Sequence, residues 1–302
     1  MLEIPQWVWI SFWTVLLLLF AIDLYSHREG REATRGWAVF WSIVWIATGG
    51  GFTLFVWGVL GGNAAHEYLA AYLIEKSLSL DNMFVFLIIF QTLKIPKANQ
   101  RTALSWGIFG ALVFRAVFIF AGAAAIQRWD WVNYIFGAIL IFAAIHAFRE
   151  NPAETKESRV VHWLSSRFPI TRDSSDRRFI VRHGNIRKAS PLLISILALE
   201  LSDVLFAIDS VPAAFSVTRS TFLIYSSNAF AILGLRSLYI VIAEYIGEMR
   251  YLHFGMAGIL CFAGIKVTFS RWIHISPIIS VAAIIILAGV AVGASLWSMK
   301  RS

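Results

Sequence analysis

Long runs of apolar residues recur along almost the whole chain, and they decide which elements the sequence predicts. The run from Pro5 to Ala21 contains no charged residue, and comparable runs follow nearly to the C-terminus. A helix needs about 20 apolar residues to cross the hydrocarbon core of a bilayer, so each run matches one span. The nine spans expected are 6–26, 36–60, 66–93, 102–126, 129–148, 190–214, 221–246, 251–271 and 275–298.

The composition agrees with a membrane protein. Of the 302 residues, 58% are hydrophobic and 15% are charged, whereas soluble domains carry about 25% charged residues. The 13 Trp residues and many of the Tyr residues lie near the ends of the runs, as interfacial aromatic residues do. The expected fold class is therefore all-α, a polytopic helical bundle that forms a single integral membrane domain over residues 1–302.

Basic residues are divided unequally between the two sets of connectors. One set holds 19 of the 26 Lys and Arg residues, and the opposite set holds only Arg128, Arg219 and Arg271. The positive-inside rule places the richer set in the cytoplasm, so the N-terminus is expected outside and the C-terminus inside. The net charge of +8 thus reflects cytoplasmic loops, and nucleic acid is not an expected partner.

The connector at 149–189 is the only sizeable polar segment, and it lies between two helical halves. Its mixed charges and its Pro, Ser and Asn content are typical of a solvated linker. A short amphipathic helix around Val160 to Phe168 is expected within it. A docking surface for a regulatory partner is the less favoured interpretation.

Nine charged residues fall in the interior of the expected spans, away from the span ends, and a charge at mid-bilayer costs about 2.5–3.5 kcal/mol. For the basic ones, which are Lys76, Arg115, Arg236 and Lys266, pairing between helices is the favoured explanation. The acidic ones gather in two stretches, 75–82 in the third span and 200–212 in the sixth. These stretches resemble weak internal repeats on oppositely directed helices, which suggests inverted repeats that meet at the membrane midplane.

Helical spacing defines a candidate site within these stretches. Glu75 and Asn82 share one helix face, with Asp81 about 100° to one side. Glu200 and Asp203 are i, i+3 neighbours on the sixth span. Carboxylates, an amide and hydroxyls, without thiolate or imidazole, form a hard oxygen site that suits magnesium, calcium or manganese.

Asp209 lies about half a turn from Glu200 on a straight helix, so an ideal helix would point it elsewhere. Pro212 is expected to kink or break this helix, because it cannot donate a hydrogen bond to the carbonyl of Ile208. The kink would bring Asp209 or free carbonyls into the site. The alternative is that Asp209 reaches an outer vestibule.

Redox and hydrolytic chemistry are not indicated by the sequence. Cys261 is the one cysteine, and it lies in an apolar run, so it is interpreted as a small packing residue. No Gly-x-Gly-Asp, Gly-x-Ser-x-Gly or His-Glu-x-x-His pattern is present. No catalytic residue and no organic cofactor are therefore expected.

Two long motifs resemble a known family. The stretch Tyr72-Leu-Ile-Glu-Lys-Ser-Leu-Ser-Leu-Asp-Asn82, together with Glu200-Leu-Ser-Asp-Val-x-Phe-Ala-x-Asp-Ser-x-Pro212, is similar to the TerC family of bacterial membrane proteins. The resemblance continues through Ser227-Asn-Ala-Phe-Ala-Ile-Leu-Gly-Leu-Arg236 and covers nearly all of the chain from Asp23 to Lys266. It implies a manganese exporter of the bacterial cytoplasmic (inner) membrane, historically labelled as tellurium resistance.

The hypothesis is a Mn²⁺ exporter with a proton-coupled, alternately accessible carboxylate site between the third and sixth spans. The expected metal ligands, at positions matching the family's acidic motifs, are Glu75, Asp81, Asn82, Glu200, Asp203 and Asp209. Candidates for charge compensation or relay are Lys76, Arg115, Asn228 and Arg236. The alternative is a membrane assembly or metal-delivery partner of the secretion or insertion machinery, which would depend on the connector more than on single carboxylates.

Overall fold

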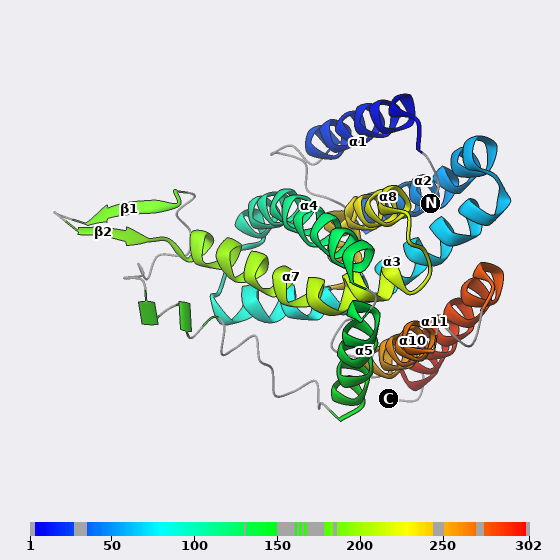
Figure 1. Ribbon diagram of the computed structural model, residues 1–302. Coiled ribbons are helices and arrows are strands. Elements are labelled where there is room, and N and C mark those ends of the chain that lie inside the picture. Colours follow the sequence, from blue (N-terminus) through cyan, green and yellow to red (C-terminus); the bar gives the residue numbers. More distant parts are fainter. Residues whose placement is uncertain are drawn as a thin grey trace.

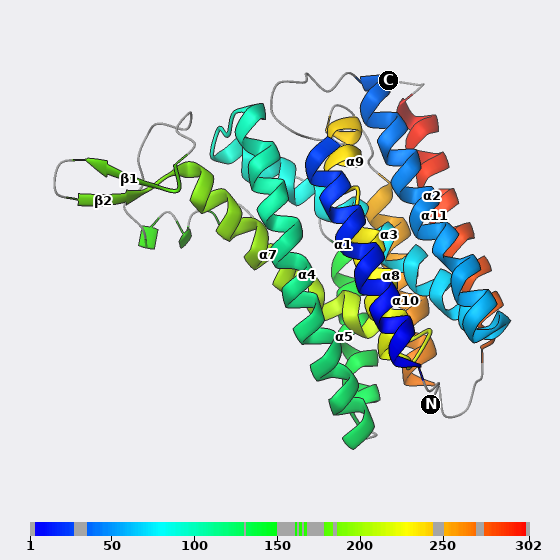
Figure 2. The ribbon, with the colours of Figure 1, turned by 90° about the horizontal axis from the view of Figure 1, so that it is seen from above.

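The computed structural model describes residues 4–26, 35–129, 131–149, 161, 163–164, 166–167, 178–183, 186–243, 251–269 and 275–299. Its helices are α1 (Gln6–Ser26), α2 (Arg35–Leu60), α3 (Gly62–Thr92), α4 (Lys97–Arg128), α5 (Val132–Arg149), α7 (Pro191–Phe215), α8 (Thr221–Ile232), α9 (Leu235–Ile242), α10 (Leu252–Thr268) and α11 (Pro277–Met299). They form a helical bundle (Figures 1 and 2), which confirms the all-α polytopic class.

Each expected span overlaps one helix, except the seventh, which consists of the two short helices α8 and α9. Among the described residues, five helices are long and apolar enough to cross a membrane, namely α1, α2, α4, α7 and α11. The α8–α9 pair, bent by 41° at its break, makes a sixth if it is one span. The number of nine spans therefore stays a prediction.

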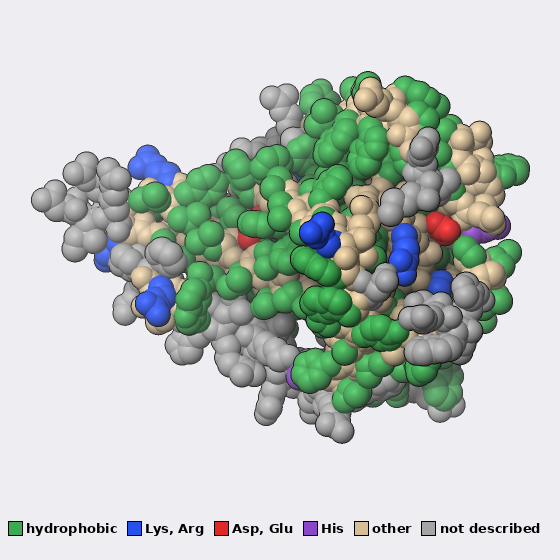
Figure 3. Space-filling view, viewed as in Figure 1, with side chains coloured by type: hydrophobic (Ala, Val, Ile, Leu, Met, Phe, Trp, Pro, Cys, Tyr) green, Lys and Arg blue, Asp and Glu red, His purple; other side chains and the backbone are tan. Residues whose placement is uncertain are grey.

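The outer surface of the bundle suits contact with lipid tails. Large apolar side chains such as Leu18, Leu54 and Ile286 are exposed there, and apolar atoms dominate the face drawn in Figure 3. Inside the bundle, aromatic rings of α1, α2 and α8 interlock. Phe52 and Phe230 have ring centroids 4.6 Å apart, and Phe12 meets Phe222 edge to face.

A close approach of α2 and α3 depends on one glycine. A Cβ at Gly49 would lie 2.5 Å from the ring of Tyr72, whereas Gly50 and Gly51 face open space. The hydroxyl of Tyr68 donates to the Gly49 carbonyl at 2.9 Å. Gly49 is thus a packing contact between helices.

α7 is continuous through Pro212, so the helix does not break at this proline, and a kink there stays a prediction. Pro212 falls in the last turn, and the helix ends three residues later at Phe215, so little helix remains beyond it to be displaced. At the other end, Pro191 takes the first helical position and the Ser190 hydroxyl accepts from the Leu193 N–H at 3.1 Å, an arrangement typical of a helix N-terminus.

The helix break lies instead between α8 and α9, where Gly234 has a φ of 80°. A residue with a side chain adopts this left-handed conformation only with strain. A Cβ at Gly234 would also lie 2.4 Å from Trp45 on α2. The discontinuous helix is therefore held against α2 at a position that only glycine fits.

The polar connector contains structure that the linker interpretation does not include. Strands β1 (Ile180–His183) and β2 (Ile186–Ala189) pair antiparallel and project from the N-terminal end of α7 (Figures 1 and 2). The described residues at 161, 163–164 and 166–167 are helical, as expected for the short amphipathic helix, and Val161 and Leu164 are buried.

Candidate cation site

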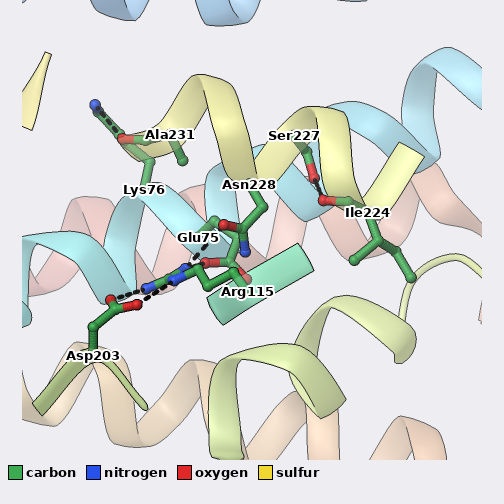
Figure 4. A network of polar contacts seen from close by, with 8 residues as sticks. All are labelled: Glu75, Lys76, Arg115, Asp203, Ile224, Ser227, Asn228 and Ala231. Carbon is green, nitrogen blue, oxygen red and sulfur yellow. Dashed lines mark hydrogen bonds and ion pairs between the residues drawn. The ribbon is translucent and has the colours of Figure 1, made fainter. Parts of the chain in front are cut away.

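Four helices bring polar side chains together at one buried point, with Arg115 of α4 at its centre (Figure 4). One guanidinium nitrogen of Arg115 lies 2.5 Å from Oε2 of Glu75 on α3. The other terminal nitrogen lies 3.0 Å from Oδ1 of Asp203 on α7, and Nε lies 3.3 Å from Oδ2 of the same carboxylate. Asn228 of α8 completes the group, because its Oδ1 accepts from Arg115 at 3.2 Å.

The charged groups of this cluster are buried, so each needs an oppositely charged partner. Glu75 is 0% exposed, Arg115 1% and Asp203 6%. Removing one partner of such a buried ion pair leaves an uncompensated charge and typically costs about 3–5 kcal/mol. The three charged groups therefore depend on one another. Arg115 forms the interhelical pairs expected for buried basic residues, and it links the two acidic stretches by contacting Glu75 and Asp203.

The two acidic helices are antiparallel, as the repeat pattern predicts. Glu67 near the start of α3 accepts a 2.6 Å hydrogen bond from the hydroxyl of Thr218, just beyond the end of α7. Eight residues further along α3, Glu75 meets the Arg115 that also binds Asp203, fifteen residues before Thr218. α3 and α7 thus run side by side in opposite directions, with the charged cluster between them.

Several buried polar atoms around this cluster have no hydrogen-bond partner among the described residues. They include Oε1 of Glu75, Oγ of Ser79, Oε2 of Glu200, Oγ of Ser202, Oγ of Ser210 and Nδ2 of Asn228. Buried polar atoms are normally satisfied, so a concentration of unsatisfied ones indicates a site built to receive water or an ion. Oxygen atoms make up most of this set, which suits a cation.

Glu200 and Asp209 flank the cluster along α7. The Glu200 carboxyl group fills the space over Gly110 of α4, where a Cβ would lie 1.9 Å from Oε1. Hydrogen bonds to Arg115 join two of the six predicted ligands, Glu75 and Asp203. That Glu200 and Asp209 belong to the same site stays a prediction.

The remaining two predicted ligands are on α3. Asn82 is buried two turns beyond Glu75. The backbone of Asp81 belongs to α3, but its side chain lies outside the described residues. Among the described side chains, no group of three or more His, Cys, Asp or Glu has the arrangement of a metal centre. The six-residue ligand set therefore stays a prediction.

The other basic residues of the spans pair between helices, as the sequence favours. Lys76 donates to the Ala231 carbonyl at 3.1 Å, near the end of α8 (Figure 4). Lys266 donates to the Ser280 hydroxyl at 2.7 Å and so links α10 to α11. In the described hydrogen bonds, neither lysine shares an acceptor with Arg115.

A second buried ion pair involves Asp23, which is not among the candidate site residues named from the sequence. Asp23 of α1 is 0% exposed and accepts from Arg236 of α9. Arg236 also donates to Ser105 of α4 at 2.7 Å. The signal available in the sequence was the position of Asp23 at the end of an apolar span, which does not reveal its partner.

A cavity of about 600 Å³ lies at the end of the bundle where α3 begins and α7 ends. Its lining includes Ile4, Glu67, Gln127, Asn133 and Thr218. All of these residues belong to segments that the positive-inside rule assigns to the outside, so the cavity lies at the end of the bundle expected to face outward. Figure 3 shows basic side chains both at the hairpin end of the view and over the helical bundle.

The chain resembles known proteins over most of its length. The model of the integral membrane protein TerC family matches residues 60–302. A membrane protein of Myxococcus xanthus is 37% identical over 298 residues, covering 98% of this chain and 93% of that protein. The Alx protein of Escherichia coli K12, named as a membrane-bound redox modulator, is 37% identical over 289 residues, with coverage of 92% and 90%.

A membrane protein of Rickettsia bellii is 34% identical over 291 residues, covering 95% of this chain and 96% of its own length. No solved structure matches the chain. The family match extends over both acidic motifs and over the helices that carry Arg115 and Asn228. The chain belongs to the integral membrane protein TerC family.

Proposed function

We propose that this protein exports a hard divalent cation, Mn²⁺ in the first place, from the bacterial cytoplasm across the inner membrane. The observation that carries the proposal is the convergence of Glu75, Asp203 and Asn228 from three helices on one buried point. Carboxylate and amide oxygens are preferred ligands of Mn²⁺, Mg²⁺ and Ca²⁺. Acidic residues inside a membrane are expensive and are normally retained for ion pathways.

Energetics favours coupled transport over a passive pore. Expelling a divalent cation against an inside-negative potential costs about 4.6 kcal/mol per 100 mV, twice the value for one charge. Exchange with protons supplies this energy, because clustered carboxylates bind protons and metal in competition. The cavity lined by Glu67 and Thr218 is on the expected outer side and is the proposed exit vestibule.

A second candidate is a docking role beside the secretion or insertion machinery. It is favoured by the hairpin β1–β2, which projects from the bundle and leaves Ile180 55% exposed. A redox role is named for the Escherichia coli relative. In this chain the single Cys261 cannot form an intramolecular disulfide, so a thiol–disulfide cycle within the protein is not proposed.

The test is manganese efflux from loaded cells that express the native protein, Glu75→Gln or Asp203→Asn. Each variant neutralises one of the two carboxylates that pair with Arg115. Export is expected to fall by at least about tenfold, because a charge-assisted hydrogen bond is replaced by a weaker neutral one. Protein in the membrane fraction is quantified in parallel, so that poor insertion is not mistaken for lost transport.

A matched variant separates the two candidates. Replacement of residues 180–189 by a Gly-Ser linker removes the hairpin and leaves the charged cluster in place. If the carboxylate variants fail while this variant exports normally, transport is supported. If the carboxylate variants export as well as the native protein, the cation site is wrong and the docking role takes its place.

A further inference from the structure

We propose that Arg115 is a tethered counter-cation that the transported divalent cation displaces and that then neutralises the site again. This inference rests on the proposed export function and assigns a specific step to one residue. Its basis is that the oxygen atoms most suited to bind a cation in the cluster are those that Arg115 occupies. The guanidinium and a bound metal ion would therefore exclude each other.

The contacts of Arg115 explain why the exclusion is strict. A divalent cation needs several oxygen atoms at about 2.0–2.6 Å. Apart from the unpartnered Oε1 of Glu75, the side-chain oxygens of the cluster are Oε2 of Glu75, both carboxylate oxygens of Asp203 and Oδ1 of Asn228, and each of these four accepts from Arg115. A cation can reach these atoms only after the guanidinium has moved away, since both would need the same lone pairs.

The net charge of the site stays small whether Arg115 or a divalent cation occupies it. With Arg115 in place, the ionised Glu75 and Asp203 keep one net negative charge, and with a divalent ion in its place they become neutral. Both arrangements are tolerable inside a membrane, whereas the two bare carboxylates are not. Arg115 thus lets the site close without metal, with the remaining negative charge balanced by a proton of the proposed exchange, and a carrier needs such a closed state in order to return for another cation.

The same residue connects the site to the discontinuous helix. Asn228 lies one turn before the end of α8, and Ala231, whose carbonyl binds Lys76, lies in the last turn. Release of Arg115 frees Asn228, and the break at Gly234 allows α8 to move without α9. Occupancy of the site by a cation therefore changes a contact of α8 together with those of α3 and α7.

The test compares net export with exchange in proteoliposomes that contain purified protein. Net export is the flux of Mn²⁺ into a compartment without the ion, and exchange is the swap of labelled for unlabelled Mn²⁺ across the membrane. Exchange never requires the site to return without cation. Arg115→Gln should therefore keep at least about half of the native exchange rate while net export falls by about tenfold or more, the loss of one charge-assisted contact.

The half-saturation concentration provides a second readout. Without the competing guanidinium, Arg115→Gln should bind Mn²⁺ about tenfold more tightly, which appears as a lower KM. A residue with only a structural role would lower exchange and net export together and would leave KM unchanged or raised. That parallel loss, or native behaviour in both assays, would overturn the inference.

Arg115→Lys keeps the positive charge, so it tests the inference even if the neutral variant Arg115→Gln does not fold. An ammonium group cannot reproduce the two-pronged contact with Asp203, so it competes less well with the metal. Net export should persist, with KM lowered by several-fold. A KM equal to or above the native value contradicts the inference. If the native protein itself shows neither flux, the proposed function fails, and this inference falls with it.

Discussion

Gly110 of α4 shapes the site through the position that it leaves for the Glu200 carboxyl group of α7. Gly110 has no side chain, and the Glu200 carboxyl group occupies the volume that a Cβ would need. The carboxyl is the end of a flexible side chain, so it can move aside at little expense to packing. A methyl group at Gly110 should therefore alter where the charge of Glu200 lies more than it alters stability.

We predict that Gly110→Ala raises KM for Mn²⁺ export by about tenfold, equivalent to about 1.4 kcal/mol. The free energy of unfolding should change by less than about 1 kcal/mol, because no backbone or rigid group is struck. Efflux kinetics and unfolding in detergent measure the two effects. Gly107→Ala, one turn earlier with ordinary contacts to Leu199, is the control and should be native in both. An unchanged KM in Gly110→Ala would show that the position of Glu200 is unimportant.

At this scale the sequence predicts the kind of residue and not its partner. Buried charges stand out in an apolar run because each one is expensive, which is how Glu75, Asp203 and Arg115 could be recognised. Their pairing depends on how helices distant in the sequence pack, and Arg115 is 88 residues from Asp203. The burial of Asp23 was missed for the same reason, since its partner Arg236 is 213 residues away.

Among the elements, α1, α4 and α9 are joined by the Asp23–Arg236–Ser105 group. α9 has only eight residues and follows the break at Gly234, so an anchor of this kind holds it in place. The group contains two fully or nearly fully buried charges in contact. Removing either Asp23 or Arg236 therefore costs stability mainly because the remaining charge stays buried without its partner.

We predict that Arg236→Met lowers the free energy of unfolding by about 3–5 kcal/mol, because Asp23 is left as a buried charge. The double variant Asp23→Asn/Arg236→Met should lose clearly less than the sum of the two single variants, which a double-mutant cycle in detergent measures. Arg219→Gln, at an exposed position, serves as the control and should change stability by less than about 0.5 kcal/mol. Strict additivity would mean that the pair contributes nothing.

The elements themselves were predictable to different degrees. Every described helix of the bundle overlaps one of the nine spans expected from the apolar runs. The runs are informative because a helix must be apolar over a sufficient length to cross the bilayer. The position of the helix break was not, since glycine is common in membrane helices and Gly234 carries no local mark of its left-handed φ. The hairpin had a usable signal, the Gly184-Asn185 dipeptide between two short β-prone stretches.

Seen as a whole, the molecule has two chemically different ends. The cavity with Ile4, Glu67 and Thr218 lies at one end of α3 and α7, and the hairpin precedes the opposite end of α7. The basic connectors belong to the hairpin end by sequence. The positive-inside rule then predicts that the hairpin is cytoplasmic and that the cavity opens outward.

We predict that Gln127→Cys reacts with a membrane-impermeant maleimide on intact cells, whereas Ile180→Cys reacts only after lysis. Gln127 is exposed in the lining of the cavity, and Ile180 is exposed on β1. Both variants are made with Cys261→Ala, which removes the one native thiol. The reverse pattern would invert the topology and would turn the proposed exporter into an importer.

The polarity of α3 has a consequence for the biogenesis of the protein. Glu67, Glu75, Lys76 and Asp81 interrupt this helix, and it is not among the helices apolar enough to cross a membrane on their own composition. The groups that compensate Glu75 and Lys76 are Arg115 of α4 and the Ala231 carbonyl of α8, which the ribosome produces later. α3 is therefore expected to integrate stably into the bilayer only after both α4 and α8 have been synthesised.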